Sequence, residues 1–268
     1  MATFKGPFKY RGKLGNIRYY EVPGDDRTYA AECGSVPRNI LLNSPVFENS
    51  RCNSFELAPK SRCAKDVRLA FSDWAQPIVD RQLQCRLISI MNDILHMDEE
   101  SSYGLRSVCL SRYKHLLYNV DYHFIKPLSN ILRCPYTVVE GENRKTVTVT
   151  LKGLNPVNHI KAPAIATHFQ LCLSLGTVKD YSYSPYFLGY VPLKNSTGNV
   201  QREILYPWTP VDNGLMEDIT LTVSLPDDFE AGDDITIVRG FGIRFGRMTG
   251  KVVLLEQERG SIAFLGPR

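Results

Sequence analysis

The sequence lacks the residue spacings that usually mark a catalytic or metal centre. None of its seven cysteines forms a Cys-x-x-Cys pair, and none of its five histidines forms a His-x-x-x-His pair. Zinc sites and dithiol redox sites usually show such spacings, because their ligands must converge on one ion or one bond. We therefore expect no metal ion, no cofactor and no catalytic residue, and we interpret the chain as non-enzymatic.

Long apolar segments are also missing. The opening residues contain no stretch that resembles a secretory signal. No run of about 18 apolar residues occurs, which is the length that a membrane-crossing helix needs. The cysteines are odd in number and scattered, which argues against a disulfide framework. We expect reduced thiols, mostly in the core, and a protein located in the cytoplasm or within a particle assembled there.

What the sequence does contain is enough apolar material for an ordinary core. Of its 268 residues, 43% are hydrophobic, which is close to the average of globular proteins. The net charge of +4 is unevenly placed: residues 1–118 carry 17 basic and 13 acidic side chains, whereas residues 119–268 carry 15 of each. The basic excess therefore belongs to the N-terminal part.

The N-terminal part begins with a predicted β-hairpin. Residues 12–22 have the composition of a strand, residues 23–26 (Pro-Gly-Asp-Asp) that of a turn, and residues 27–32 that of the returning strand. A two-stranded hairpin alone is marginal in water. We therefore expect the hairpin to pack on something else, such as another subunit.

Helices are predicted next, over residues 44–118. Ser44 and Pro45 suit a helix start, and Pro59 predicts a kink or a second helix. The clearest helical pattern follows Pro77, where one stripe consists of Val79, Leu83, Leu87, Ile90 and Ile94. A short helical piece at residues 112–118 closes this module.

From about residue 120 the apolar period changes to two. Residues 146–151, 169–175 and 219–225 alternate between apolar and other side chains, which predicts strands with one buried and one wet face. The predicted fold class is α+β: an N-terminal hairpin and helical module (residues 1–118) followed by an antiparallel β-sandwich-like domain (residues 119–268).

Two segments carry a family resemblance. The first is Gly-x-x-Gly-Asn-x-Arg at residues 12–18, and the second is Asn-x-Pro-x-Phe at residues 43–47, followed by Arg51, Phe55 and Glu56. The chain resembles a family of uncharacterised Bacteroidota proteins that begin with such a glycine-rich strand and end in a β-rich domain. Pro59, inside the long helix, departs from that pattern. The resemblance implies no activity.

Two other patterns resemble functional motifs. Gly240, Gly242 and Gly246 resemble a phosphate-binding loop, but they lie within a strand pattern, so we expect a bulge near Arg239 or close packing of a neighbour. Ser111 and Lys114 have the Ser-x-x-Lys spacing of a nucleophile and its base. The other elements of that catalytic set are absent, so we interpret this spacing as coincidental.

An acidic cluster lies near the end of the chain. It consists of Asp227, Asp228, Glu230, Asp233 and Asp234. Oxygen ligands suit calcium, but the spacing is not that of an EF-hand. The alternative is an electrostatic partner for the basic N-terminal arm of a neighbouring copy.

The arm itself interleaves aromatic and basic side chains. The residues that we predict to bind a partner are Lys5, Phe8, Lys9, Tyr10, Arg11 and Arg18. Such a combination can dock on protein, or it can stack on bases and neutralise phosphates. The third alternative is an arm that binds nothing.

Three functional hypotheses remain open. The first is a structural subunit that self-assembles into a homo-oligomer such as a ring, a tube or a phage-like particle. The second is an accessory protein that binds nucleic acid or another ligand through the arm and through exposed Tyr181, Tyr183, Tyr186 and Tyr190. The third is a carbohydrate-active enzyme, which would need two of Glu203, Asp212, Glu217 and Asp218 to converge.

Overall fold

The computed structural model divides the chain into two compact units, Met1–Arg51 and Cys52–Arg268, which are called unit 1 and unit 2 below. The structure describes residues 2–4, 11–22, 25–34, 36–71, 73–78, 80, 82–118, 120–141, 144–193, 200–230, 232–250 and 252–266. The predicted division after residue 118 falls inside unit 2. The reason is that the helices before this point pack on strands that follow it.

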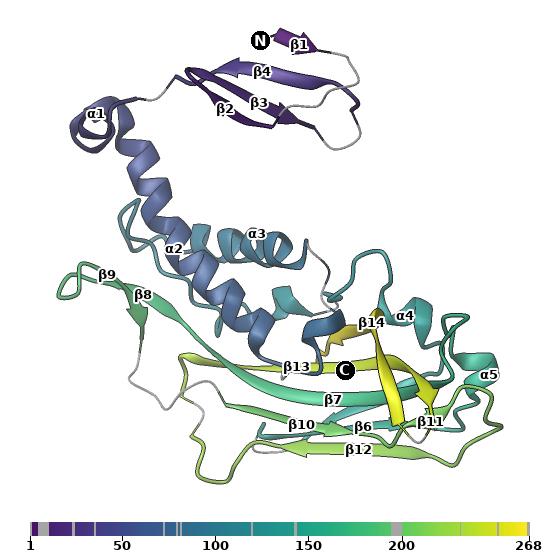
Figure 1. Cartoon of the computed structure of the whole chain (residues 1–268). Helices are drawn as coiled ribbons and strands as arrows, with labels where there is room; N and C mark the ends of the chain where they lie inside the picture. Colours follow the sequence, from purple (N-terminus) through teal and green to yellow (C-terminus); the bar gives the residue numbers. More distant parts are fainter. Residues whose placement is uncertain are drawn as a thin grey trace. The chain divides into compact units, whose positions relative to one another are not determined.

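Unit 1 is a four-stranded antiparallel sheet followed by short helices (Figure 1). The strand order is β1-β4-β3-β2, with β1 at Ala2–Phe4, β2 at Gly12–Leu14, β3 at Ile17–Glu21 and β4 at Thr28–Glu32. The predicted hairpin corresponds to β3 and β4. The strand expected over residues 12–22 is divided by a turn at Gly15, whose φ of +59° suits a residue without a side chain.

The helices begin at the end of unit 1. They are α1 (Arg38–Asn43), a 3₁₀ turn (Pro45–Phe47) and the long α2 (Glu48–Leu69), in which unit 2 begins at Cys52. Pro59 lies inside α2, so the alternative in which a second helix begins there is wrong. The missing hydrogen bond is offset by packing, since Cys63, Ala64 and Val67 on the following turns are fully buried.

Unit 2 adds shorter helical pieces. They are a 3₁₀ turn at Gln76–Ile78, α3 at Leu83–His96, a 3₁₀ turn at Lys114–Leu117, α4 at Leu128–Ile131 and α5 at Pro156–His159. The predicted stripe of α3 is confirmed at Leu83, Leu87 and Ile94, which are buried, while Ile90 is half-buried. Val79 lies outside the described residues.

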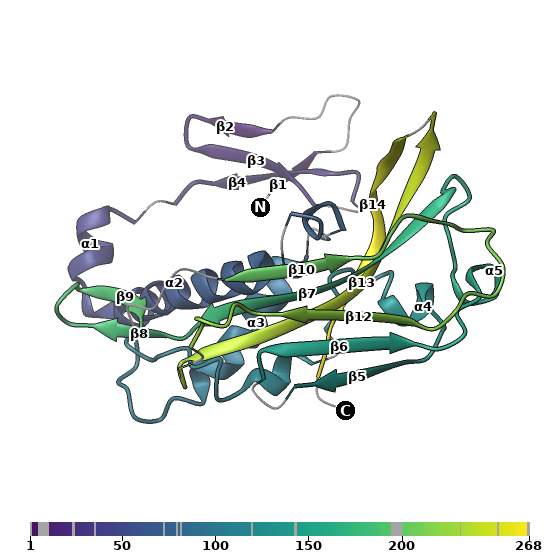
Figure 2. The ribbon, with the colours of Figure 1, turned by 90° about the horizontal axis from the view of Figure 1, so that it is seen from below.

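Two antiparallel sheets form the β-rich part of unit 2 (Figure 2). One contains β10 (Gln201–Leu205), β7 (His168–Lys179), β13 (Ile235–Thr249) and β14 (Val252–Phe264) in that order, and β11 (Thr209–Pro210) also pairs with β7. The other contains β12 (Ile219–Ser224), β6 (Thr146–Leu151) and β5 (Tyr136–Glu140). A separate hairpin pairs β8 (Tyr181–Ser184) with β9 (Gly189–Pro192).

Two cores make unit 2 a three-layer structure. One core lies between the sheets, where Val149 of β6 and Leu221 of β12 belong to the same cluster as Leu173 of β7. The other core lies between the opposite face of the larger sheet and the helices, and it includes Val67, Leu87 and Ile262. The predicted α+β class with a sandwich-like β-rich part is therefore confirmed, with helices covering one outer face (Figure 1).

This third layer corrects the expectation that β7 has a wet face. All of its residues between the two ends are buried, because helices cover the face opposite the second sheet. Small residues allow the close approach: a Cβ on Gly176 would lie 2.0 Å from the carbonyl oxygen of Ala70, and one on Gly240 would lie 2.4 Å from the ring of Phe71. Close packing, one of the two alternatives considered for Gly240, is thus confirmed.

The expected bulge near Arg239 is wrong. The register of β13 against β7 is continuous from Ile235 to Gly246, and the irregularity lies against β14, between Arg244 and Gly246. Arg239 points inward and is buried because it forms an ion pair with Glu140 of β5. A charged partner, and not a change of register, makes this inward position tolerable.

The cysteines are free, and only Cys63, Cys134 and Cys172 are buried. The expectation that most are core residues is therefore wrong, most plainly for the exposed Cys85. Among the described residues, no helix combines the length and the apolarity that crossing a bilayer requires.

Candidate assembly surfaces

Unit 1 has no apolar core in its described part. Only Thr28 is buried there, and both core clusters of the chain consist of residues from unit 2. Leu14 is 73% exposed and Val46 is 84% exposed. A small sheet gains its stability by burying a face. The described residues of unit 1 therefore do not supply that cover among themselves.

The register assigns different chemistry to the two faces of this sheet. Leu14 lies opposite Ile17, and Tyr19 lies opposite Ala30 on the same face. This surface, the apolar face of unit 1, is open because Leu14 and Ile17 are exposed and Tyr19 is half-buried.

The opposite face combines cations with aromatic rings. Lys13 and Arg18 lie directly opposite each other, and neither forms an ion pair with a described residue. Two residues along, Tyr20 and Tyr29 stack with ring centroids 5.6 Å apart. We call these four residues the cationic face of unit 1. Two like charges placed opposite each other weaken a sheet unless something of the opposite sign covers them.

Helix α1 adds further exposed apolar side chains to unit 1. Ile40, Leu41 and Leu42 are exposed, and no residue of the helix is buried. The Arg51 guanidinium donates hydrogen bonds of 2.9 Å to the carbonyl oxygens of Leu41 and Ser44, which ties the end of α1 to the start of α2. Polar contacts therefore hold the helix in place, while its leucine side chains are exposed to solvent.

Electrostatic contacts also fix the β3–β4 turn. Asp25 accepts hydrogen bonds from the Arg27 guanidinium and from the Tyr29 hydroxyl, the latter at 2.6 Å. These contacts, first that from Arg27 and then that from Tyr29, hold the pKa of Asp25 well below its usual value. Asp25 in turn raises the pKa of Tyr29 through their hydrogen bond.

Of the residues predicted to bind a partner, Lys5, Phe8, Lys9 and Tyr10 lie outside the described residues. Arg11 forms an ion pair with Glu21 of β3. Arg18 lies on the cationic face of unit 1, beside Lys13. The two described members therefore differ: one is neutralised within unit 1, and the other has no described counter-charge.

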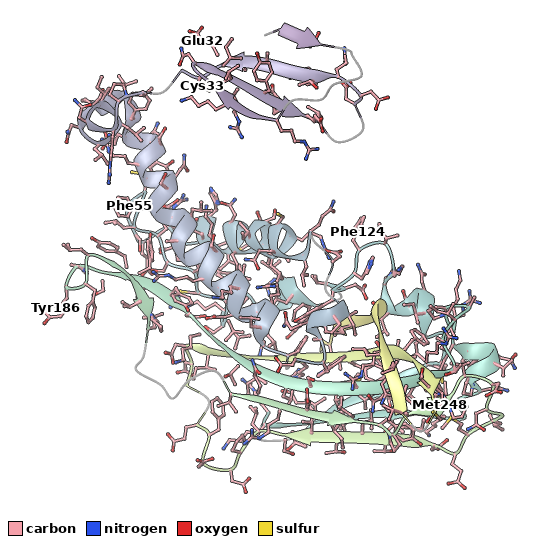
Figure 3. All side chains as sticks on the ribbon, in the orientation of Figure 1. Glu32, Cys33, Phe55, Phe124, Tyr186 and Met248 are labelled. Atoms are coloured by element: carbon pink, nitrogen blue, oxygen red, sulfur yellow. The ribbon has the colours of Figure 1, made fainter. Side chains whose placement is uncertain are left out.

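Unit 2 carries a projecting apolar turn between β8 and β9. Tyr186, Phe187 and Leu188 are 87%, 67% and 76% exposed. Figure 3 shows Tyr186 at the end of this hairpin, directed away from the rest of unit 2. Its ring packs edge-on against that of Phe187, with centroids 4.9 Å apart. We call residues 185–188 the hairpin tip.

Polar contacts anchor the base of the same hairpin. The Tyr190 hydroxyl donates to the Gly104 carbonyl (3.1 Å), and the Tyr181 hydroxyl donates to the Asp66 carboxylate (2.7 Å). The Arg62 guanidinium donates to the Tyr190 carbonyl (2.7 Å). Burial raises the pKa of Tyr190 to about 12, so this hydroxyl remains a donor at neutral pH.

A buried ion pair supports the loop that receives this hairpin. The Arg106 guanidinium donates to both oxygens of Glu56 at 2.8 and 2.7 Å, and the Gly104 amide donates to the same carboxylate. Burial alone would raise the pKa of Glu56, but the hydrogen bonds from Arg106 and Gly104 bring it below its usual value. The hairpin tip therefore projects from a rigid base.

These contacts correct the prediction of four exposed tyrosines. Tyr181 and Tyr190 are buried, Tyr183 is half-buried against Tyr190, and Tyr186 alone among the four is exposed. The sequence alone did not distinguish the four tyrosines, and Phe187 and Leu188 were not among the residues expected to bind a ligand. The available signal was an apolar triplet between Pro185 and Gly189, where a turn usually carries polar residues.

A second apolar projection is the end of the β13–β14 ribbon. Beyond Gly246, β13 pairs with β14 alone, and Met248, Val252 and Leu254 are exposed there. Figure 3 labels Met248 on this ribbon. Two paired strands with exposed apolar residues and a free edge can accept a further strand.

The motifs considered for catalysis have structural partners. The Ser111 hydroxyl donates to Asp180 at 2.6 Å, and the Ser111 amide donates to the same carboxylate at 2.9 Å. Burial raises the pKa of Asp180 to about 6, partly offset by these bonds. The serine thus fastens the loop after Val108 to the end of β7. Among the carboxylates considered for carbohydrate chemistry, Asp218 accepts a bond from the Gly153 amide.

Within the described ranges, no three His, Cys, Asp or Glu side chains are grouped so that they could hold a metal ion. This includes the acidic residues of 227–234. Asp227, Asp228 and Glu230 are instead exposed. They present negative charge to the surroundings of unit 2.

None of the family models, curated proteins or solved structures compared with this chain matches it.

Proposed function

We propose that the protein is a non-enzymatic structural subunit that self-assembles into a homo-oligomer, with unit 1 of one copy docking on a neighbouring copy. The observation that carries this proposal is the absence of buried apolar residues in the described part of unit 1. Covering one large aliphatic side chain stabilises an interface by about 1.5–3 kcal/mol. Leu14, Ile17 and the apolar residues of α1 together offer several such gains.

Charge favours a second copy as the cover. The cationic face of unit 1 presents Lys13 and Arg18 without a described counter-charge, and unit 2 presents Asp227, Asp228 and Glu230 on its surface. Each copy thus carries both halves of an electrostatic match, which suits contacts between identical chains. The hairpin tip and the β13–β14 ribbon add apolar contacts from unit 2. We place the assembly in the cytoplasm, or in a particle that forms there.

Light scattering on the purified chain at micromolar concentration tests this proposal. We expect a discrete multimer of the 30.3 kDa chain. Leu14→Ser combined with Leu42→Ser is expected to yield monomers, because two exposed leucines of unit 1 lose their cover. The matched control is Val157→Ser with Leu215→Ser, two exposed apolar residues of unit 2 outside the proposed contacts. A wild-type monomer at these concentrations contradicts the proposal.

The cationic face supports a second candidate, an accessory protein that binds single-stranded nucleic acid. Lys13 and Arg18 can neutralise phosphates, and the rings of Tyr20 and Tyr29 lie on the same face. This candidate predicts retention on single-stranded DNA at low salt that Lys13→Glu with Arg18→Glu abolishes. If the same variant loses the multimer and the wild type does not bind DNA, the cationic face serves assembly.

A further inference from the structure

Unit 2 contains a cavity of about 420 Å³ that the assembly proposal does not use. Its described lining residues come from three separate parts of unit 2: the segment 125–131, which includes α4, the segment 161–163, and the residues Phe245 and Gly260 of the larger sheet. The volume lies in the lower part of the range of about 300–1,000 Å³ that is typical of small-molecule sites.

The floor of this cavity is apolar and the rim is cationic. Ile131 and Phe245 are buried lining residues, whereas Lys126 and Lys161 are exposed lining residues. Among the described lining residues there is no Asp or Glu, and neither lysine side chain has an ion pair or hydrogen bond with a described residue. The cavity therefore has two ammonium groups without described counter-charges beside an apolar hollow. Such a site favours a ligand that is an anion with an apolar body.

Backbone hydrogen bonds hold the two lysine-bearing segments together. The Lys161 amide donates to the Ile131 carbonyl (2.8 Å), and the Arg133 amide donates to the His159 carbonyl (2.8 Å). A bridge between Leu132 and Ile160 lies between these bonds. The walls are therefore preformed, so a ligand would not have to order them on binding.

Ser261 is not a lining residue of the cavity, but it follows the lining residue Gly260 in β14. Ser261 pairs with Ile243, and Ile243 and Phe245 point to the same face of β13, so the Ser261 side chain shares that face with Phe245. Its hydroxyl is fully buried and has no hydrogen-bond partner among the described residues. An unpaired buried hydroxyl is uncommon in folded proteins.

From this combination we infer that the cavity is a binding site for a small amphipathic anion, namely a carboxylate on a short aliphatic or aromatic body. Lys126 and Lys161 receive the carboxylate at the rim, and Ile131 and Phe245 contact the apolar body. The site does not depend on the proposed assembly, because all of its described lining residues belong to unit 2.

Isothermal titration calorimetry of the full chain with octanoate tests the inference, with octan-1-ol and acetate as matched probes. We expect octanoate to bind. Octan-1-ol lacks the charge and acetate lacks the apolar body, so each should bind at least about tenfold more weakly than octanoate. No octanoate binding, or octan-1-ol or acetate binding as tightly as octanoate, overturns the inference.

Variants locate the binding. Lys126→Gln with Lys161→Gln is expected to weaken octanoate binding about tenfold, whereas the exposed Lys152→Gln outside the cavity leaves it unchanged. Ala162→Trp, which fills the hollow, is expected to abolish it. Equal binding by the double lysine variant, or equal loss in the Lys152 control, assigns octanoate to another surface and overturns the inference. Light scattering of the same variants reports assembly separately, so the two proposals fail independently.

Discussion

The two compact units of the chain differ in where their apolar side chains lie. Unit 2 encloses two clusters, one between its sheets and one beneath its helices, and many of their members are fully buried. In the described part of unit 1 the apolar side chains are half-buried or exposed. Both units contain antiparallel strands paired in continuous register, so the two units do not differ in the hydrogen bonding of their strands. The two units differ in how much apolar surface they bury, and such burial is the main source of folding free energy.

Unit 2 therefore covers its own strands with apolar cores, whereas the described residues of unit 1 do not cover theirs. Substitutions at equivalent features of the two units should therefore have unequal effects. Both tryptophans, Trp74 and Trp208, lie in unit 2, so their fluorescence during urea unfolding follows unit 2.

The largest difference is expected for apolar truncations. Phe169→Ala removes a fully buried ring from the core between the sheets and should lower the free energy of unfolding of unit 2 by about 3–5 kcal/mol. Leu14→Ala in unit 1 should change it by less than about 0.5 kcal/mol. Urea titration monitored by fluorescence measures both. Similar losses for the two variants would break the comparison.

Breaking an ion pair should likewise destabilise unit 2 more than unit 1. Glu56→Ala leaves the Arg106 side chain, which is only 14% exposed, without its partner and should cost about 3 kcal/mol. Glu21→Ala in unit 1 removes the partner of Arg11, which is 77% exposed, and should cost less than about 1 kcal/mol. Circular dichroism during thermal unfolding measures the difference. An equal shift of the midpoint temperature would show that burial does not govern these pairs.

Carboxyl groups of the two units should respond to pH with opposite signs. Asp180 in unit 2 has a pKa raised to about 6 by burial, so it holds its proton more tightly when folded. Its contribution is full below the unfolded pKa near 4 and declines by about 2–3 kcal/mol as the pH rises to about 6. Asp180→Asn should remove this decline.

Asp25 in unit 1 has a lowered pKa, so its contribution is present above the unfolded value and is lost as the pH falls. Asp25→Asn should therefore remove a dependence of the opposite sign. The measurement is the difference in the free energy of unfolding between each variant and the wild type from about pH 2 to pH 7, since the contribution of Asp25 is lost only below its unfolded pKa of about 4. If the decline in stability persists in Asp180→Asn, another group causes it, and the prediction for Asp180 is wrong.

Glycines give the smallest predicted contrast. Gly240→Ala places a methyl group 2.4 Å from the Phe71 ring and should cost about 1–3 kcal/mol. Gly34→Ala in unit 1 meets no atom within 4 Å and should change stability by less than about 1 kcal/mol. Urea midpoints measure both variants. A neutral Gly240→Ala would show that the helix layer is less tightly packed than its contacts indicate.

Helices and strands could be predicted from the sequence wherever one face is buried and the other is exposed, because the apolar residues then recur with the period of that element. The alternation in residues 219–225 predicted β12, and Ile219, Leu221 and Val223 are buried as expected. The stripe of α3 was predicted for the same reason. Long-range contacts could not be predicted: nothing local to β7 indicates that helices cover its second face, and nothing local to Arg239 names Glu140 as its partner.

The candidate surfaces were predictable only in part. Arg18 was expected to bind a partner and lies on the cationic face of unit 1, but its neighbour Lys13 became evident from the register. The hairpin tip was missed because only the fold shows that Tyr181 and Tyr190 are buried while Tyr186 is exposed. The cavity joins segments more than a hundred residues apart, and such a juxtaposition leaves no local pattern in the sequence.

Hydrogen exchange at two protein concentrations tests the central claim most directly. At micromolar concentration, where the multimer forms, the amides of β3 and β4 should be protected, and at nanomolar concentration they should exchange rapidly. The amides of β7 and β13 should stay protected at both concentrations. Protection of β3 and β4 that does not change with dilution would mean that the chain covers its own sheet, and it would contradict the account.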